Sequence, residues 1–212
     1  MPRIAKDPAE RRNEIMDAAM ELFSTKGYEH TSVRDIVNKI GVAQGTFYYY
    51  FTSKEEVATA VHERSLTARL HQVASVVDDV NLTAVEKLQQ VLQQAFFTPK
   101  QEHAILEYFH DESNSVLHQK ALAAKITAFT PYIVKIVQQG IDEGVFQLDN
   151  PQEVTEFLLV GISFLFDPAF FTWSDEEIRK KLLALEGIVD RLLGGKRIFS
   201  AAALIETMIK PR

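Results

Sequence analysis

Residues 31–54, TSVRDIVNKIGVAQGTFYYYFTSK, decide the fold of this chain. The first part of the stretch carries an apolar side chain at i, i+3, i+4 and i+7, namely Val33, Ile36, Val37 and Ile40. This spacing places the four side chains on one face of an α-helix. Gly41 follows at once, where a helix commonly ends in a residue with a positive φ angle. The sequence therefore predicts a short helix that buries one face and ends in a glycine turn.

A second short helix is expected after this turn. One side of it carries Ala43, Phe47 and Phe51, each four residues from the next, which predicts a buried face. The opposite side presents mostly polar residues and a glycine: Gln44, Gly45, Thr46, Tyr48 and Tyr49. Two short helices joined by a tight turn form a helix-turn-helix, in which the second helix enters the major groove of DNA. The partner indicated by this stretch is double-stranded DNA.

The stretch and its flanks resemble the DNA-binding signature of the tetracycline-repressor (TetR) family of bacterial transcription regulators. The resemblance rests on residues 18–36, AAMELFSTKGYEHTSVRDI, and on residues 41–57, GVAQGTFYYYFTSKEEV. It implies an all-α fold, with a three-helix DNA-binding domain over residues 1–55 and a helical effector-binding and dimerisation domain over residues 56–212. It also implies a homodimeric regulator, normally a repressor, that leaves a palindromic operator when a small apolar molecule binds.

Several side chains of the stretch suit contacts with DNA. Thr31 and Ser32 are expected to cap the first short helix and to contact phosphate, because hydroxyl groups and helix N-termini supply many contacts to the DNA backbone. Arg34 lies in the first turn of that helix and is expected to reach a phosphate or a base edge. Gln44 starts the second helix, and a glutamine side chain can pair with N6 and N7 of adenine. We therefore interpret Gln44 as the principal base-reading residue.

The remaining contacts expected within the second helix and just after it are less specific. Gly45 would let the backbone approach DNA closely, and Thr46 would meet a thymine methyl group or a phosphate. The run Tyr48, Tyr49 and Tyr50 spans most of a helical turn, so at least one of these rings must face DNA. The family resemblance implies that all three contact phosphates or bases, and that Lys54 contacts phosphate.

Composition and charge agree with a regulator of the cytoplasm. The chain has 212 residues, no cysteine and a formal net charge of −6, which argues against a general nucleic-acid coat protein. Residues 31–54 nevertheless hold three cations against the single acid Asp35. No segment near Met1 resembles a signal peptide, and the apolar run 157–166 is too short to span a bilayer, so no membrane partner is expected.

The C-terminal part is rich in aromatic residues that suit either a hydrophobic core or an effector pocket. Helices are expected throughout, with capping boxes at residues 83–86, 150–153 and 174–177 and a proline kink at Pro131. An apolar pocket between bundle helices is a common ligand site. The candidates for its lining are Phe96, Tyr108, Phe109, Phe129, Tyr132 and Phe164.

Two C-terminal helices are candidates for a dimer interface. The segment 154–165 is apolar nearly all round, so one side of it requires a partner. The next helix carries an apolar seam, and two such helices from each subunit would form a four-helix bundle. The expected interface residues are Phe157, Leu158, Gly161, Leu165, Ile178, Leu182, Leu185 and Val189. Burial of both stripes within one chain remains the alternative.

Metal and catalytic chemistry receive little support from the sequence. A polar face made of His103, Glu107, His110 and Asp111, with His118 nearby, could ligate a metal but is expected to be a solvated stripe, so no metal and no cofactor are predicted. The sequence contains no phosphate-binding loop, nucleophile elbow or metalloprotease motif, and an enzyme is not expected. Two alternatives to a specific regulator stay open: a non-specific DNA-binding protein, and a helical enzyme with an aromatic cavity.

Overall fold

The computed structural model describes residues 6–96, 102–195, 198 and 200–209, without the side chains of Ala95, Phe96, Ala203 and Thr207. Every regular element within these residues is a helix, which confirms the predicted all-α fold. The chain forms two compact units: Met1–Thr67 with Pro99–Phe109, and Ala68–Thr98 with His110–Arg212. The first unit thus extends beyond residue 55, the boundary expected from the sequence, and includes a later segment of the chain.

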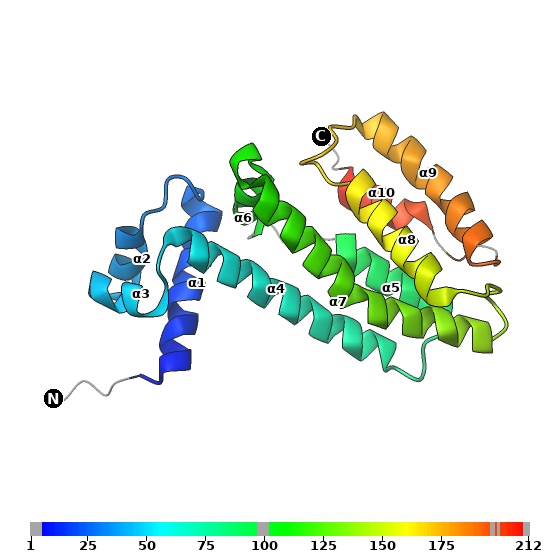
Figure 1. Ribbon diagram of the computed structural model, residues 1–212, viewed down its shortest axis with the longest axis horizontal. Coiled ribbons are helices and arrows are strands. Elements are labelled where there is room, and N and C mark those ends of the chain that lie inside the picture. Colours follow the sequence, from blue (N-terminus) through cyan, green and yellow to red (C-terminus); the bar gives the residue numbers. More distant parts are fainter. Residues whose placement is uncertain (1–5, 97–101, 196–197, 199, 210–212) are drawn as a thin grey trace. The chain divides into compact units, whose positions relative to one another are not determined.

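The helices are labelled in Figure 1. Their bounds are α1 (Pro8–Lys26), α2 (Val33–Ile40), α3 (Gln44–Tyr50), α4 (Lys54–Val77), α5 (Ala84–Phe96), α6 (His103–His110), the 3-10 helix η2 (Glu112–Asn114), α7 (Ser115–Asp142), α8 (Pro151–Leu165), α9 (Asp175–Leu192) and α10 (Ala201–Met208). None of the helices in the described ranges has the length and apolar character needed to cross a lipid bilayer.

The first unit is built around the long helix α1. Asp7 caps it, because its carboxylate accepts hydrogen bonds from the backbone N–H groups of Ala9 at 2.8 Å and Glu10 at 3.4 Å. α1 contacts α2, and α2 contacts α3, so that these helices form the predicted three-helix domain (Figure 1). Their shared core consists of fully buried side chains: Ile15, Ala19, Phe23, Ile36 and Phe47.

Helix α4 begins with a cap to which both Thr52 and Ser53 contribute. The hydroxyl of Ser53 accepts from the backbone N–H of Glu56 at 3.2 Å. The carboxylate of Glu56, however, accepts from the backbone N–H and the hydroxyl of Thr52, both at 2.6 Å. The next turns of α4 bury Val57, Ala58 and Val61. The two half-caps fix the direction in which α4 leaves the helix-turn-helix.

In the second unit, α7 packs on α5 and α8, while α10 packs on α5 and α9. The capping boxes at the starts of α5 and α9 are confirmed: Thr83 with Glu86, and Ser174 with Glu177. The box expected at residues 150–153 is wrong, because the side chain of Asn150 makes no capping hydrogen bond. Pro131 lies inside α7, which continues on both sides of it.

The apolar faces of α8 and α9 are divided between core and surface. Within the single chain, α9 buries Leu182, Leu185 and Val189, so the prediction that these residues meet a partner subunit is corrected. The exposed apolar residues of α9 are instead Leu183 and Ile188. On α8, Thr155, Leu159 and Ile162 are buried, whereas Phe157, Val160, Gly161 and Phe164 lie on an exposed stripe with i, i+3, i+4 and i+7 spacing. Leu158, Leu165 and Ile178 are half-buried.

Candidate nucleic-acid interface

The turn between α2 and α3 is fixed by its backbone. Gly41 ends α2 in the left-handed region, with φ 68° and ψ 38°, as its glycine identity predicts. The N–H of the next residue, Val42, donates to the carbonyl of Val37 at 3.0 Å. The chain then turns into α3 at Ala43, whose methyl group supplies no capping hydrogen bond. Ala43 is exposed, so its expected place in the buried face of α3 is corrected.

Helix α3 has one buried side and one exposed side. Phe47 and Phe51 are buried, with ring centroids 5.9 Å apart, and they attach the helix to the core. The exposed side, called here the reading face, consists of Gln44, Gly45, Tyr48 and Tyr49. Tyr49 is 78% exposed and its ring meets the half-buried Tyr50 edge to face at 4.9 Å. Thr46 is half-buried. A rigid helix thus presents hydrogen-bonding side chains and aromatic rings to solvent.

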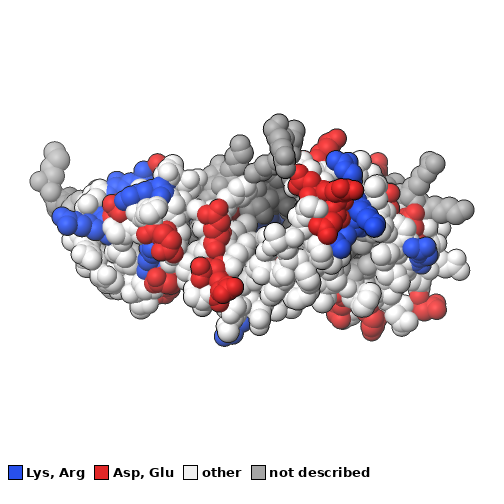
Figure 2. All heavy atoms as spheres, turned by 90° about the horizontal axis from the view of Figure 1, so that it is seen from above, with Lys and Arg blue, Asp and Glu red and all other residues white. Residues whose placement is uncertain are grey.

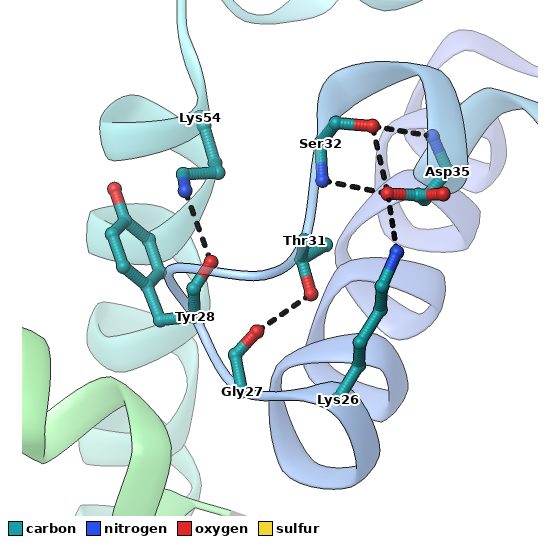
Figure 3. Close-up of polar contacts among 7 residues, drawn as sticks. All are labelled: Lys26, Gly27, Tyr28, Thr31, Ser32, Asp35 and Lys54. Atoms are coloured by element: carbon teal, nitrogen blue, oxygen red, sulfur yellow. Dashed lines mark hydrogen bonds and ion pairs between the residues drawn. The ribbon is translucent and has the colours of Figure 1, made fainter.

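The start of α2 carries a reciprocal cap (Figure 3). The hydroxyl of Ser32 accepts from the backbone N–H of Asp35 at 3.1 Å, and the carboxylate of Asp35 accepts from the N–H and hydroxyl of Ser32. Lys26 donates to the same carboxylate at 2.8 Å. The hydrogen bonds from Lys26 and Ser32 hold the pKa of Asp35 well below its usual range. Ser32 is exposed, and its hydrogen bonds with the carboxylate and the backbone of Asp35 order the N-terminus of α2.

Thr31 has a different role from the one predicted. It is 2% exposed, and its hydroxyl donates to the carbonyl of Gly27 at 2.7 Å, which closes the turn between α1 and α2 (Figure 3). A buried hydroxyl that is already bonded cannot face a phosphate from this position. The residue holds the loop in place, and Ser32 supplies the cap.

The cations of this region are only partly free to meet DNA. Lys39 pairs with Glu21 at 2.7 Å. Arg34 is exposed and makes no ion pair within the part of the chain that the structure describes. The ammonium group of Lys54 donates to the backbone carbonyl of Tyr28 at 3.0 Å, and it lies 4.0 Å from the centre of the Tyr28 ring. The hydrogen bond uses one of its three donors, so two are left to meet a phosphate. Figure 2 shows basic and acidic side chains interspersed on the face that it draws, so this view contains no uniformly basic surface.

The residues expected to line an effector pocket are divided between the two units. Tyr108 and Phe109 belong to the first unit, where their rings lie 4.1 Å from Tyr28 and 4.7 Å from His62. The side chain of Phe96 lies outside the described residues. In the second unit, a cavity of about 20 Å³ is lined by Leu92, Lys125, Ile126, Phe129, Leu159, Ile162 and Ser163. A space of this size holds about one water molecule.

Two other predicted pocket residues have positions of their own. Phe164 is exposed and stacks on Phe170 at 4.4 Å, while Tyr132 is half-buried on α7. Among the candidates whose side chains the structure describes, Phe129 is the one that lines this cavity. Sequence reasoning missed Leu92, Leu159 and Ile162, because aliphatic residues in an apolar helix give no signal that separates a cavity wall from ordinary core.

Comparison with known proteins covers both parts of the chain. Residues 15–61 match the model described as bacterial regulatory proteins of the tetR family, and residues 98–188 match the tetracyclin repressor-like C-terminal domain. The HTH-type transcriptional repressor KstR2 of Mycobacterium tuberculosis is 28% identical over 70% of this chain and 76% of its own length. The fatty acid metabolism regulator protein of Bacillus subtilis is 26% identical over 85% of this chain and 92% of its own length.

Solved structures of similar proteins have the same fold. A TetR/AcrR-family transcriptional regulator from Thermobifida fusca matches with a TM-score of 0.60 at 25% identity, over 89% of this chain and 99% of that chain. A TetR-family regulator from Pectobacterium atrosepticum matches with a TM-score of 0.68 at 18% identity, over 91% of this chain and 100% of that chain. The structural likenesses show the fold, and the family matches over residues 15–61 and 98–188 establish that the chain belongs to the TetR family of bacterial transcription regulators.

Proposed function

We propose that this protein is a repressor that binds a palindromic operator as a homodimer and releases it when a small apolar molecule binds the second unit. The observation that carries the proposal is the reading face of α3, which is exposed while Phe47 and Phe51 anchor the other side of the helix. Helices held in this way suit insertion into the major groove. Because such a regulator acts on bacterial DNA, its place of action is the cytoplasm.

The proposed DNA contacts divide into base reading and backbone positioning. Gln44 reads a base edge, and Gly45 allows close approach at the start of α3. Ser32, Arg34 and Lys54 contact phosphates, as do Thr46 and Tyr50 from the flank of α3, while Tyr48 and Tyr49 reach bases or phosphates. Thr31 is left out of this set because its hydroxyl is buried and bonded to Gly27.

The proposed dimer uses the exposed apolar stripe of α8 and the exposed residues of α9. Phe157 is 71% exposed in the single chain, and Val160, Phe164, Leu183 and Ile188 are also exposed. Large exposed apolar side chains on two successive helices are typical of an interaction surface. A two-fold axis through this surface would provide two reading faces for the two halves of a palindrome.

The proposed effector is apolar because the side chains around the small cavity of the second unit are mainly aliphatic and aromatic, among them Leu92, Phe129 and Leu159. The cavity must widen to admit a molecule larger than water. The name of the Bacillus subtilis relative, a fatty acid metabolism regulator, supports the same chemical class. To release DNA, the effector must bind the arrangement with low DNA affinity better than the arrangement with high affinity. Enlarging the cavity through Phe129→Ala should change the response to an effector while leaving operator affinity without effector nearly unchanged.

Site selection from a pool of random DNA duplexes tests the proposal. We expect the wild-type protein to enrich an inverted repeat, and Gln44→Ala to enrich a repeat that is relaxed at one position of each half-site. A non-specific DNA-binding protein would enrich no common sequence. That outcome would overturn the operator proposal and would favour the alternative that the sequence left open.

A further inference from the structure

Three side chains that are far apart in the sequence meet in the second unit. His110 ends α6, His118 lies in the first turns of α7, and Asp167 follows α8. Nε2 of His118 lies 2.9 Å from Oδ2 of Asp167, and Nε2 of His110 lies 3.9 Å from Oδ1 of the same carboxylate. One potential ligand atom from each residue lies within 4.8 Å of the others. Two imidazoles and one carboxylate therefore converge on a single point.

We propose that His110, His118 and Asp167 form a binding site for a divalent transition-metal cation, with Zn²⁺ as the best fit. Imidazole nitrogen and carboxylate oxygen bind Zn²⁺ at roughly 2.0–2.2 Å, so neighbouring ligand atoms in a tetrahedral site are about 3.3 Å apart. The separations of 2.9 and 3.9 Å lie on either side of that value. Three protein ligands leave a fourth position for water or for an oxygen atom of a bound small molecule.

The carboxylate is held in the orientation that a ligand needs. Oδ1 of Asp167 accepts from the backbone N–H of Ala169 at 2.9 Å, and the carbonyl of Asp167 accepts from Phe170 at 3.2 Å and Phe171 at 3.1 Å. Hydrogen bonds of this kind around a ligand orient it and raise metal affinity. The turn after α8 thus holds the carboxylate of Asp167 in place beside the two imidazole rings.

The two histidines differ in their freedom to move. The ring of His118 is buried and packs on Phe170 at 5.4 Å. The side chain of His110 is 23% exposed and lies near the end of a short helix. The ligand atoms lie up to 4.8 Å apart, more than the roughly 3.3 Å of a tetrahedral site, so His110 must move closer to Asp167 and His118 when a cation binds.

A simple hydrogen-bonded pair does not account for the whole arrangement. A hydrogen bond that ties α7 to the turn after α8 requires only His118 and Asp167. The second imidazole, His110, comes from a third element and faces the same carboxylate at a distance beyond hydrogen bonding.

The ammonium group of Lys125 interacts electrostatically with Asp167, and its positive charge opposes a bound cation. Burial and the charge of Arg69 lower the pKa of Lys125, although Asp167 raises it. Burial raises the pKa of Asp167, but the hydrogen bonds from His118 and Ala169 and the nearby histidines together bring it below the usual value.

Titration with ZnCl₂ in competition with a chromophoric chelator tests the site, with the full chain purified without a histidine tag and with no DNA present. We expect one Zn²⁺ per chain, and affinity lower by at least about tenfold in His110→Ala and in Asp167→Asn. His71→Ala and His103→Ala, which alter histidines outside the cluster, should bind as the wild type does. Mg²⁺ should not compete, because it prefers oxygen ligands.

Thermal unfolding followed by circular dichroism guards against loss of fold. Zn²⁺ should raise the melting temperature of the wild type and not that of His110→Ala, since a ligand stabilises only the state that binds it. If Asp167→Asn does not fold, the more exposed His110→Ala carries the test alone. Equal Zn²⁺ affinity in wild type and His110→Ala, or a loss confined to His71→Ala or His103→Ala, would overturn the proposal. Neither result depends on whether the protein binds an operator.

Discussion

Replacing Phe157 by glutamate should convert the proposed dimer into a folded monomer. Phe157 is 71% exposed in the single chain. A phenylalanine covers about 200 Å², so burying the exposed part removes about 140 Å² from water, worth about 3.5 kcal/mol. A two-fold interface contains the residue twice, which gives about 7 kcal/mol. The loss of translational and side-chain freedom on association offsets part of this free energy. If about half of it remains, the dissociation constant of the Phe157→Glu dimer should exceed that of the wild type by a factor of roughly 300.

Sedimentation velocity over a micromolar concentration series measures this effect. The matched control is Val80→Glu, which adds the same charge at an apolar residue that is 93% exposed outside α8 and α9. Circular dichroism should show the same helix content in both variants, and only Phe157→Glu should lose operator binding. If Phe157→Glu sediments as the wild type does, the exposed stripe of α8 is not the interface and the reasoning fails.

Three further predictions concern the first unit. Gln44→Ala should cost about 1–3 kcal/mol on the preferred operator and much less on random duplexes, as fluorescence anisotropy would measure; equal losses on both would remove its role as a base reader. Thr31→Val should lower the free energy of unfolding by about 1 kcal/mol through loss of the hydrogen bond to Gly27, and the salt dependence of DNA binding should stay the same; a flatter slope would restore a phosphate contact. The ion pair with Lys26 lowers the pKa of Asp35 in the folded state, so its stabilising effect is complete above the unfolded pKa of about 3.9 and declines as the pH falls below it. The stability difference between wild type and Asp35→Asn in denaturant titrations should therefore shrink below about pH 4; a difference independent of pH would contradict this.

The helix-turn-helix could be predicted from the sequence because local chemistry determines it. The spacing of Ile36 and Val37, the left-handed glycine at Gly41 and the cap at Ser32 act within a few residues of one another. The structure confirms these elements and the exposure of Gln44 at the start of α3. The i, i+4 spacing wrongly places Ala43 on the buried face of α3, because Ala43 is the N-cap residue and does not follow the helical periodicity.

The contacts of the second unit could not be predicted in the same way. Periodicity shows that α9 has an apolar stripe, but not whether that stripe meets its own chain or a partner. Leu182 and Leu183 are neighbours in the sequence, yet one is buried and the other is exposed. His118 and Asp167 are separated by 49 positions, so only the tertiary packing of α7 against α8 brings them together. Pairings over such distances leave no local pattern in a single sequence.

The proposal that this protein recognises a specific operator is tested most directly by the ratio of its affinities for two DNA duplexes. The first is the affinity of the wild-type protein for the inverted repeat enriched by site selection, and the second is its affinity for a scrambled duplex of the same length and composition, both at about 0.15 M salt. A specific repressor should prefer the inverted repeat by at least about a thousandfold. Equal affinity for the two duplexes would contradict the account, because the reading face of α3 would then recognise no sequence.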